Sequence, residues 1–352
     1  MKSLSPILRN LVAIVSFFLP VLAGTLPDGG EGAAAERAFA GVLAKYGVSG
    51  GALAIVRDGK LVASRGFGRA SVEAVFPIAS CTKPITVAAA MILVREGRLR
   101  LDEPAWAIVP EFVPWRRDGR LDTITVRDLI EHSGGWDRTA TGRDEDVVVA
   151  AMRTGRSTGE VLRVIAGQPL DFAPGLRRQY SNAGALLLGA IVEKVSGQTY
   201  EAFVRERVLA PLGMARTGLS VTAAVRQWGG AGGLAASMPD LVRFVDSAGE
   251  EGWAQGGALH DHGLAWMYRG VDGISVAWAV DSSPVSGDFG AEAAEAILAA
   301  MGSRERAVEA GVSPGEGEGA GMRRSRTRKF KAPVYNAKKH RATVYKKPRI
   351  RR

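Results

Sequence analysis

The chain contains only one cysteine, Cys81, among its 352 residues. A single thiol cannot form an internal disulfide, so a disulfide-stapled scaffold and a cysteine-rich zinc site are both excluded. Lysine is also scarce in the body of the chain: residues 24–320 hold 26 arginines and only four lysines. Arginine stays charged in proteins, whereas lysine can lose its proton, so chemistry that needs a removable proton requires a lysine and not an arginine. Apolar residues are not lacking: at 46% of the chain they suffice for a packed core and exclude wholesale disorder.

The net charge of +10 resides in the C-terminal segment. Residues 321–352 contain 14 lysines and arginines and no acidic residue, whereas residues 1–320 carry a net charge of −4. Cations interleaved with Phe330, Tyr335 and Tyr345 are typical of a segment that binds anionic surfaces or polymers. Because the N-terminus predicts export, the expected partner is an anionic lipid or wall polymer rather than nucleic acid. A solvated extension without function and a rearranged gene end are the alternatives.

The first 23 residues have the organisation of a secretory signal peptide. Lys2 and Arg9 form a basic start, and an apolar run of 13 residues follows from Leu11 to Ala23. A membrane-spanning helix needs about 20 residues, so a cleaved signal is favoured over an anchor. We therefore expect a periplasmic or secreted protein with three parts: a signal peptide at 1–23, a folded domain at 24–312, and a disordered Gly-rich then basic tail at 313–352.

The body mixes the periodicities of strands and helices. Apolar runs at 52–56 and 61–64 flank Asp58-Gly59, which predicts a β-hairpin. Other signals predict helices over 82–96, 183–195 and 291–301, a helix that begins after an N-cap at Ser237, and a strand over 274–280. Strands at both ends of the body with helices between them predict an α+β fold. It would consist of a mainly antiparallel β-sheet flanked by helices, with an inserted all-helical lobe.

Ser80 and Lys83 form a Ser-x-x-Lys motif at the start of the helix predicted over 82–96. A serine at a helix N-terminus lies near free backbone N–H groups, which favour a developing oxyanion. A lysine three residues later lies one turn away on the same helix face, within reach of the serine hydroxyl. To act as a base the lysine must lose its proton near neutral pH, which burial or a second cation favours. The motif is weak alone, since this composition predicts about 0.7 matches by chance.

Tyr180 and Asn182 form a second motif, just before the helix predicted over 183–195. Chance predicts only about 0.05 Tyr-x-Asn matches in this composition. A tyrosine that faces a Ser/Lys pair can relay a proton between nucleophile, leaving group and water. Asparagine offers a donor and an acceptor to the lysine or the substrate, and Asn182 is also the expected N-cap of its helix.

Taken together, these motifs resemble those of the serine β-lactamase-like hydrolases, which include class C β-lactamases, penicillin-binding peptidases, D-amino-acid peptidases and related esterases. The resemblance runs from about Ala52 to Phe244. It also covers Gly97–Pro104, Leu129–Gly134, Pro174-Gly175 and Gly232–Ser237.

The resemblance implies a role for each residue of the two motifs. Ser80 would be the acylated nucleophile, Lys83 its base, and Tyr180 the partner that activates Ser80 or the deacylating water. Asn182 would form a hydrogen bond to the substrate, and the Ser80 backbone N–H would be half of the oxyanion hole.

The family resemblance also implies a third motif, Lys or His followed two positions later by Gly, on an edge strand beside the nucleophile. We expect that strand between Gly263–Tyr268 and Ile274–Val280, where only Arg269–Gly273 lies. Neither His260 nor His262 is followed two positions later by glycine. The third motif is therefore predicted to be missing. Loss of one oxyanion donor costs about 10²–10³ in rate, so weak or absent activity is an open alternative.

Several other residues offer competing sites. Gly47–Gly51 matches the G-x-S-x-G nucleophile elbow, but an elbow needs a strand before it and a helix after it, and the reverse order is predicted here. His132 has no acid placed beside it for a catalytic triad, and His260 with His262 supplies too few ligands for a metal. Cys81 is expected to be a buried helix residue rather than a reactive thiol. We therefore expect neither a metal nor a cofactor.

Two functional hypotheses concern the folded body, and a third makes the basic tail the functional part, with the body as its scaffold. The first is an exported serine hydrolase that forms an acyl-enzyme at Ser80 and hydrolyses an ester, an amide in a D-amino-acid peptide, or a β-lactam. Its substrate would be a small molecule or a peptide acyl donor. The alternative is a non-catalytic binding protein on the same fold, whose basic tail contacts an anionic surface or polymer.

Overall fold

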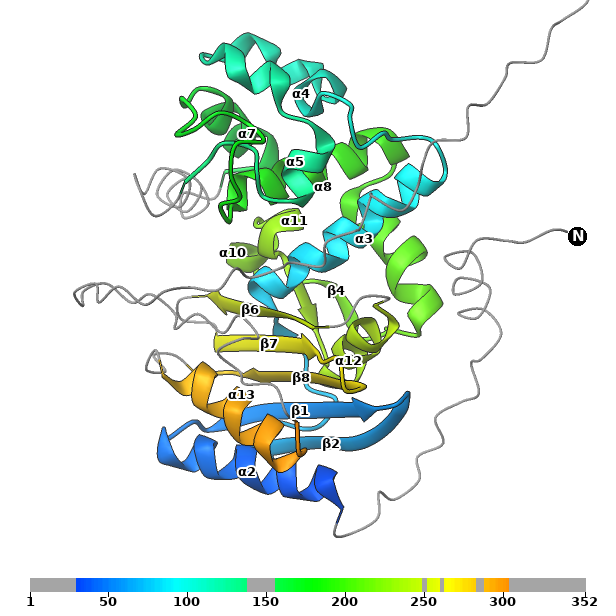
Figure 1. Ribbon diagram of the computed structural model, residues 1–352, viewed down its shortest axis with the longest axis vertical. Coiled ribbons are helices and arrows are strands. Elements are labelled where there is room, and N and C mark those ends of the chain that lie inside the picture. The colour runs from blue at the N-terminus through cyan, green and yellow to red at the C-terminus, as the bar shows by residue number, and fades with distance from the viewer. Residues whose placement is uncertain (1–29, 138–155, 249–251, 260–262, 283–287, 304–352) are drawn as a thin grey trace, which may run out of the picture.

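The computed structural model describes residues 30–137, 156–248, 252–259, 263–282 and 288–303. Five of the described strands form one antiparallel sheet in the order β2-β1-β8-β7-β6 (Figure 1). These strands are β1 (Gly50–Arg57), β2 (Lys60–Gly68), β6 (Trp253–Leu259), β7 (Gly263–Arg269) and β8 (Ile274–Val280). Strands from the start and the end of the body therefore meet in one sheet, with β6 at its edge.

The hairpin β1–β2 forms where the sequence predicts it. Asp58 and Gly59 connect the two strands with φ values of 50° and 75°. A two-residue turn with both φ values positive matches the twist of the flanking strands, and Asp and Gly are among the residues that tolerate it. The predicted strand over 274–280 is confirmed as β8.

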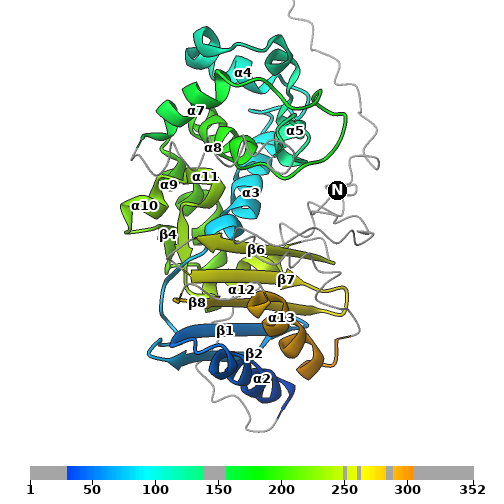
Figure 2. The same cartoon turned by 90° about the vertical axis from the view of Figure 1, so that its left-hand side faces the viewer.

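The two faces of the sheet pack against different helices. On β1, Leu53 and Ile55 join the core beneath α2 (Glu31–Lys45) and α13 (Phe289–Ala300), whereas Ala52 and Ala54 join the core on the opposite face. That second core includes α12 (Met238–Ser247), which contacts β1 and β8. Figures 1 and 2 show α2 and α13 lying together against the sheet. The alternation of side chains along a strand places both cores around one sheet, as the predicted fold class requires.

The helical lobe is inserted between β2 and β6 and lies beyond the β6 edge of the sheet (Figure 2). Its helices are α3 (Thr82–Arg95), α4 (Ala105–Ile108), α5 (Val126–Ile130), α7 (Thr158–Ala166), α8 (Asn182–Ser196), α9 (Tyr200–Val204), α10 (Ala223–Arg226) and α11 (Gly229–Gly232). A small sheet in the order β3-β5-β4 connects the lobe to α12, and its strands are β3 (Phe76–Pro77), β5 (Leu234–Ala236) and β4 (Thr217–Leu219). The predicted α+β fold with an inserted helical lobe is confirmed.

The boundaries of the predicted helices agree closely with the structure. Both α3 and α8 end just before a glycine in the left-handed region, Gly97 at φ 71° and Gly197 at φ 73°. The side chain of Ser237 accepts a hydrogen bond from the backbone of Asp240 and caps α12 as predicted. Helix α13 begins two residues earlier than expected, at Phe289.

Two expectations about the chain ends lie outside the described residues, namely the signal peptide at 1–23 and the tail at 313–352. Within the described ranges, no helix combines the length and the apolar character needed to cross a membrane. The segment Gly47–Gly51 follows helix α2 and includes the first two residues of strand β1, which is the wrong order for a nucleophile elbow, as expected.

Candidate active site

Ser80 lies in a short 3₁₀ turn, Ala79–Cys81, that leads directly into α3. Ala79 adopts a left-handed backbone conformation with φ 46°, which costs an alanine about 1–2 kcal/mol. The last residue of the turn, Cys81, links it to β6, because the buried Sγ of Cys81 donates a hydrogen bond to the Gln255 carbonyl oxygen at 3.2 Å. Ser80 itself is partly exposed, as a nucleophile must be.

Lys83 lies one turn after Ser80 and is almost fully buried, with only 4% of its surface exposed. Its Nζ donates to Ser80 Oγ at 3.0 Å and to the Ala231 carbonyl oxygen at 2.6 Å. Ala231 belongs to α11, so a backbone carbonyl from a distant segment orients the Lys83 Nζ toward the serine.

Helix α11 is held against α3 by close packing and hydrogen bonds. Thr86 Oγ1 donates to the Gly230 carbonyl oxygen at 2.7 Å, and the Leu234 amide donates to Thr82 Oγ1 at 3.2 Å. A Cβ atom at Gly230 would lie 2.9 Å from Gly189 Cα of α8, so only glycine fits there. Helices α3 and α8 together therefore fix the position of the carbonyl that binds Lys83.

Tyr180 completes the group around the serine hydroxyl. Its hydroxyl donates to Ser80 Oγ at 2.6 Å, and Lys83 Nζ lies 4.8 Å from the centroid of its ring. The three residues predicted as catalytic, Ser80, Lys83 and Tyr180, thus meet at one point, although 100 positions separate the tyrosine from the serine.

Asn182 is the first residue of α8 and is buried, two positions after Tyr180. The expectation that it caps the helix is wrong. Ser181 is the N-cap, and its side chain accepts a hydrogen bond from the Gly184 amide at 3.0 Å. Serine and asparagine cap helices about equally well, so their order in the sequence does not decide between them.

The edge strand beside the nucleophile is β6, not a strand after Gly263. The stretches expected to flank the motif, Gly263–Tyr268 and Ile274–Val280, are the neighbouring strands β7 and β8. The sheet order places β6 outermost, where it contacts the turn of Ser80. The expected location of the third motif is therefore wrong.

On β6, Gln255 and Gly257 stand at the spacing of the Lys/His-x-Gly motif, with glutamine in place of the cation. A Cβ atom at Gly257 would lie 2.3 Å from the Ile78 carbonyl oxygen and 3.0 Å from the Ser80 amide nitrogen. The two backbones thus approach so closely that only glycine fits. Gly257 is not predicted from the sequence because it precedes the expected location and has no Lys or His two positions before it.

His132 does not contact the serine in the manner of a catalytic triad. Its ring stacks on the Tyr180 ring, with centroids 5.0 Å apart and planes inclined by 25°, and its Nδ1 accepts a hydrogen bond from the Ser181 amide at 3.2 Å. Burial, together with the nearby cations Lys83 and Arg178, lowers the pKa of His132 to about 3. The imidazole is therefore neutral near pH 7.

The remaining sequence-derived candidates do not add to this site. Burial raises the pKa of the Cys81 thiol, so Cys81 is not a reactive nucleophile near neutral pH. Across the ranges that the structure describes, no group of three or more His, Cys, Asp or Glu side chains is arranged to hold a metal ion. His260 and His262 lie outside the described residues.

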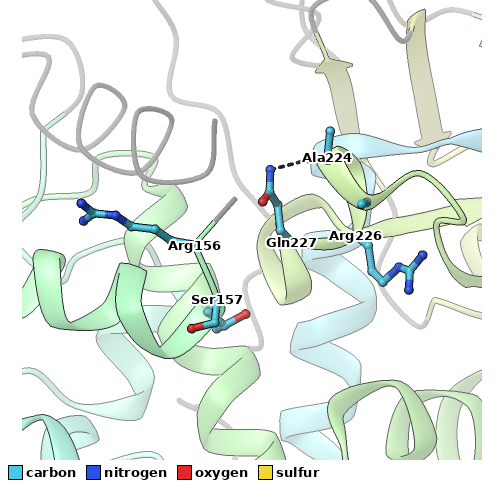
Figure 3. A pocket seen from close by; sticks show the side chains of 7 residues that line it. Arg156, Ser157, Ala224, Arg226 and Gln227 are labelled. Atoms are coloured by element: carbon cyan, nitrogen blue, oxygen red, sulfur yellow. Dashed lines mark hydrogen bonds between the residues drawn. The ribbon is translucent and has the colours of Figure 1, made fainter. Parts of the chain in front are cut away.

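A separate concavity of about 510 Å³ lies between the start of α7 and α10 (Figure 3). Its lining consists of Arg156, Ser157, Thr158, Ala223, Ala224, Arg226 and Gln227. The Gln227 side chain donates to the Ala224 carbonyl oxygen, and the Arg226 guanidinium donates to the carbonyl oxygens of Ser220 and Val221. None of the predicted site residues lines this concavity.

Comparisons with known proteins agree with this geometry. The sequence profile of the Beta-lactamase family matches residues 35–294. The chain is 39% identical over 185 residues to Esterase EstB of Burkholderia gladioli, a match that covers 47% of this chain and 45% of that protein. It is 31% identical over 188 residues to Protein flp of Staphylococcus aureus (strain N315), covering 51% of this chain and 36% of that protein. The matched region thus spans less than half the length of either curated relative.

Solved structures with the same fold have lower sequence identity. A penicillin-binding protein homologue from Pyrococcus abyssi superposes with a TM-score of 0.60 at 23% identity, covering 76% of this chain and 77% of that chain. A class C beta-lactamase superposes with a TM-score of 0.61 at 16% identity, covering 78% and 98%. These similarities confirm the predicted fold.

Proposed function

Because the chain belongs to the Beta-lactamase family, we propose that it is a serine hydrolase that forms an acyl-enzyme at Ser80. One observation carries the proposal: Ser80 Oγ accepts hydrogen bonds from both Lys83 Nζ at 3.0 Å and the Tyr180 hydroxyl at 2.6 Å. Two proton-transferring groups converge on one partly exposed serine hydroxyl, which is the arrangement that nucleophilic catalysis requires.

In the proposed reaction Ser80 Oγ attacks the carbonyl carbon of the substrate while its proton passes to Lys83 in its neutral form. Tyr180 donates a proton to the leaving group and recovers one from Lys83. A water molecule then attacks the acyl-enzyme, and its proton travels through Tyr180 as the Ser80 hydroxyl is restored. General acid–base steps of this kind contribute about 10²–10⁴ in rate.

The Ser80 amide and a backbone N–H of β6 near Gly257 are the proposed oxyanion donors. A Cβ atom at Gly257 would lie 3.0 Å from the Ser80 amide nitrogen, and this close approach of the two backbones supports the assignment. Asn182, buried in the first turn of α8, is the proposed hydrogen-bond partner of the substrate.

An ester is the proposed substrate class. Gln255 replaces a cation on β6, and the strand Trp253–Leu259 contains no charged residue. A neutral amide offers hydrogen bonds but cannot neutralise a carboxylate, which both D-amino-acid peptides and penicillins carry. The similarity to Esterase EstB supports the same choice over an amide or a β-lactam.

A fluorophosphonate probe followed by intact-mass analysis tests the proposal. The wild type should gain one adduct and Ser80→Ala none, whereas Ser64→Ala, which removes a partly exposed serine on β2, should label like the wild type. Equal labelling of Ser80→Ala would contradict the proposal.

Turnover then separates an enzyme from a non-catalytic binding protein. A p-nitrophenyl ester should be hydrolysed with saturation, and Lys83→Ala should abolish the reaction. A chromogenic cephalosporin should be hydrolysed far more slowly. Absence of labelling and of turnover together would favour the binding protein.

Export to the periplasm or medium and contact of the basic tail with an anionic surface belong to the same proposal. The net charge of residues 321–352 and the organisation of residues 1–23 support it. Fractionation of cells that express the chain with and without residues 1–23 tests export. Sedimentation with anionic vesicles, with and without residues 321–352, tests the tail, and unchanged binding after truncation would contradict that role.

A further inference from the structure

His132 contacts three consecutive residues around Tyr180. Its carbonyl oxygen accepts a hydrogen bond from the Gln179 amide at 2.7 Å, and its Nδ1 accepts one from the Ser181 amide at 3.2 Å. Between these two bonds, its ring stacks on the Tyr180 ring with a centroid distance of 5.0 Å. The backbone on both sides of the tyrosine and the tyrosine ring itself are therefore held by one residue.

The backbone of His132 is adapted to this task. His132 has φ 57°, in the left-handed region, and it ends the turn that follows α5. This conformation lets both its carbonyl oxygen and its side chain face the segment 179–181. Non-glycine residues adopt such a conformation rarely, and usually where the surrounding structure requires it.

We propose that His132 is the positioning residue for Tyr180, which it holds so that the tyrosine hydroxyl lies within hydrogen-bond distance of Ser80 Oγ. The proposal rests on the proposed function, since it assigns Tyr180 to proton transfer at Ser80. His132 acts through its contacts with residues 179–181 and not on the substrate. The Ser181 amide requires Nδ1 to be unprotonated, so the ring serves as a neutral acceptor and a stacking surface.

Two variants separate the two contacts of the side chain. His132→Asn keeps an acceptor near the position of Nδ1 and tolerates the left-handed backbone, but it loses the stacked ring. His132→Ala loses both contacts. We expect His132→Ala to lower kcat for a p-nitrophenyl ester by about 10–100-fold with little change in KM, and His132→Asn to recover part of that loss.

The deciding measurement is a double-mutant cycle with Tyr180→Phe. Residues that act as a unit show strongly non-additive losses. If His132 acts by positioning the tyrosine hydroxyl, His132→Ala should cost less than about 3-fold once that hydroxyl is gone. An equal fold-loss in both backgrounds would overturn the proposal.

Ser133→Ala is the matched control for general damage to the turn. It removes the 2.7 Å hydrogen bond from Ser133 Oγ to Asp128 Oδ1 in the same turn. It should lower the melting temperature and leave kcat near the wild-type value. A loss of kcat as large as that of His132→Ala would also overturn the proposal, because any damage to the turn would then suffice.

A crystal structure of His132→Ala gives a readout that does not depend on turnover. The Tyr180 hydroxyl should move out of hydrogen-bond distance of Ser80 Oγ, and an unmoved hydroxyl would overturn the role of His132. The two possible failures are thus distinct. An unlabelled wild type would contradict the proposed function, whereas labelling with additive losses and an unmoved tyrosine would contradict only the role of His132.

Discussion

Acidification should weaken the fold through His132, and replacing this residue by asparagine should remove that part of the sensitivity. Burial, aided by the cations Lys83 and Arg178, lowers the pKa of His132 from 6.5 to about 3. In the unfolded chain the imidazole regains its ordinary pKa. Between the two values the unfolded chain binds a proton that the native protein does not, so the free energy of unfolding falls as the pH drops below 6.5.

The size of the effect follows from the distance in pH below the unfolded pKa. Each pH unit costs about 1.4 kcal/mol for a fully shielded group. His132 is half-buried, so solvent screens part of this cost. Between about pH 7 and pH 5 we expect the free energy of unfolding to fall by about 1–2 kcal/mol through this residue alone.

Urea unfolding of the wild type and His132→Asn at both pH values measures the effect. Other groups with shifted pKa values, such as Asp240, are common to both proteins and cancel in the comparison. The variant should gain about 1–2 kcal/mol relative to the wild type on acidification. A difference that stays constant with pH would refute the assignment of a neutral, half-buried imidazole. A change of opposite sign would mean that the native state prefers the imidazolium.

Three further predictions concern the packing around the nucleophile. Gly257→Ala should lower the rate of probe labelling by at least about 10²-fold, because its Cβ would lie 2.3 Å from a backbone oxygen. Gly256→Ala, whose nearest neighbour would be 4.0 Å away, should label normally. Gly230→Ala should destabilise the protein by about 1–3 kcal/mol in urea unfolding, whereas Gly218→Ala, with nothing within 4 Å, should not. The Cys81 thiol should react with an aromatic disulfide reagent only after unfolding, since burial raises its pKa; fast reaction of the folded protein would contradict this.

Local sequence signals predicted the elements because the physical causes of those elements are local. The Asp58-Gly59 turn and the terminal glycines Gly97 and Gly197 all adopt positive φ, as turns and helix ends require. Helix spacing predicts that Lys83 reaches the Ser80 hydroxyl, whereas the placement of Tyr180 beside this pair rests on the family resemblance. The structure brings the three side chains together.

The position of the edge strand could not be predicted from local signals. Strand pairing decides which strand is outermost, and the antiparallel pairing of β6 with β7 leaves β6 there. The stretch Trp253–Leu259 carries Gly256 and Gly257, which weaken a strand signal. The contacts of His132 with residues 179–181 likewise join segments almost 50 positions apart, which no spacing rule connects.

The locally unfavourable features of the chain gather at the candidate site. Of the three non-glycine residues with positive φ in the described ranges, Asp58 serves a hairpin turn, while Ala79 and His132 lie next to Ser80 and Tyr180. The buried polar end of Lys83 adds a desolvation cost that an apolar side chain would avoid. Stability alone favours glycine at position 79 and an apolar residue at position 83. The chain instead has Ala79 and His132 with positive φ and a buried Lys83. These three features bring proton-transferring groups to one serine oxygen, which supports the assignment of Ser80 as the nucleophile.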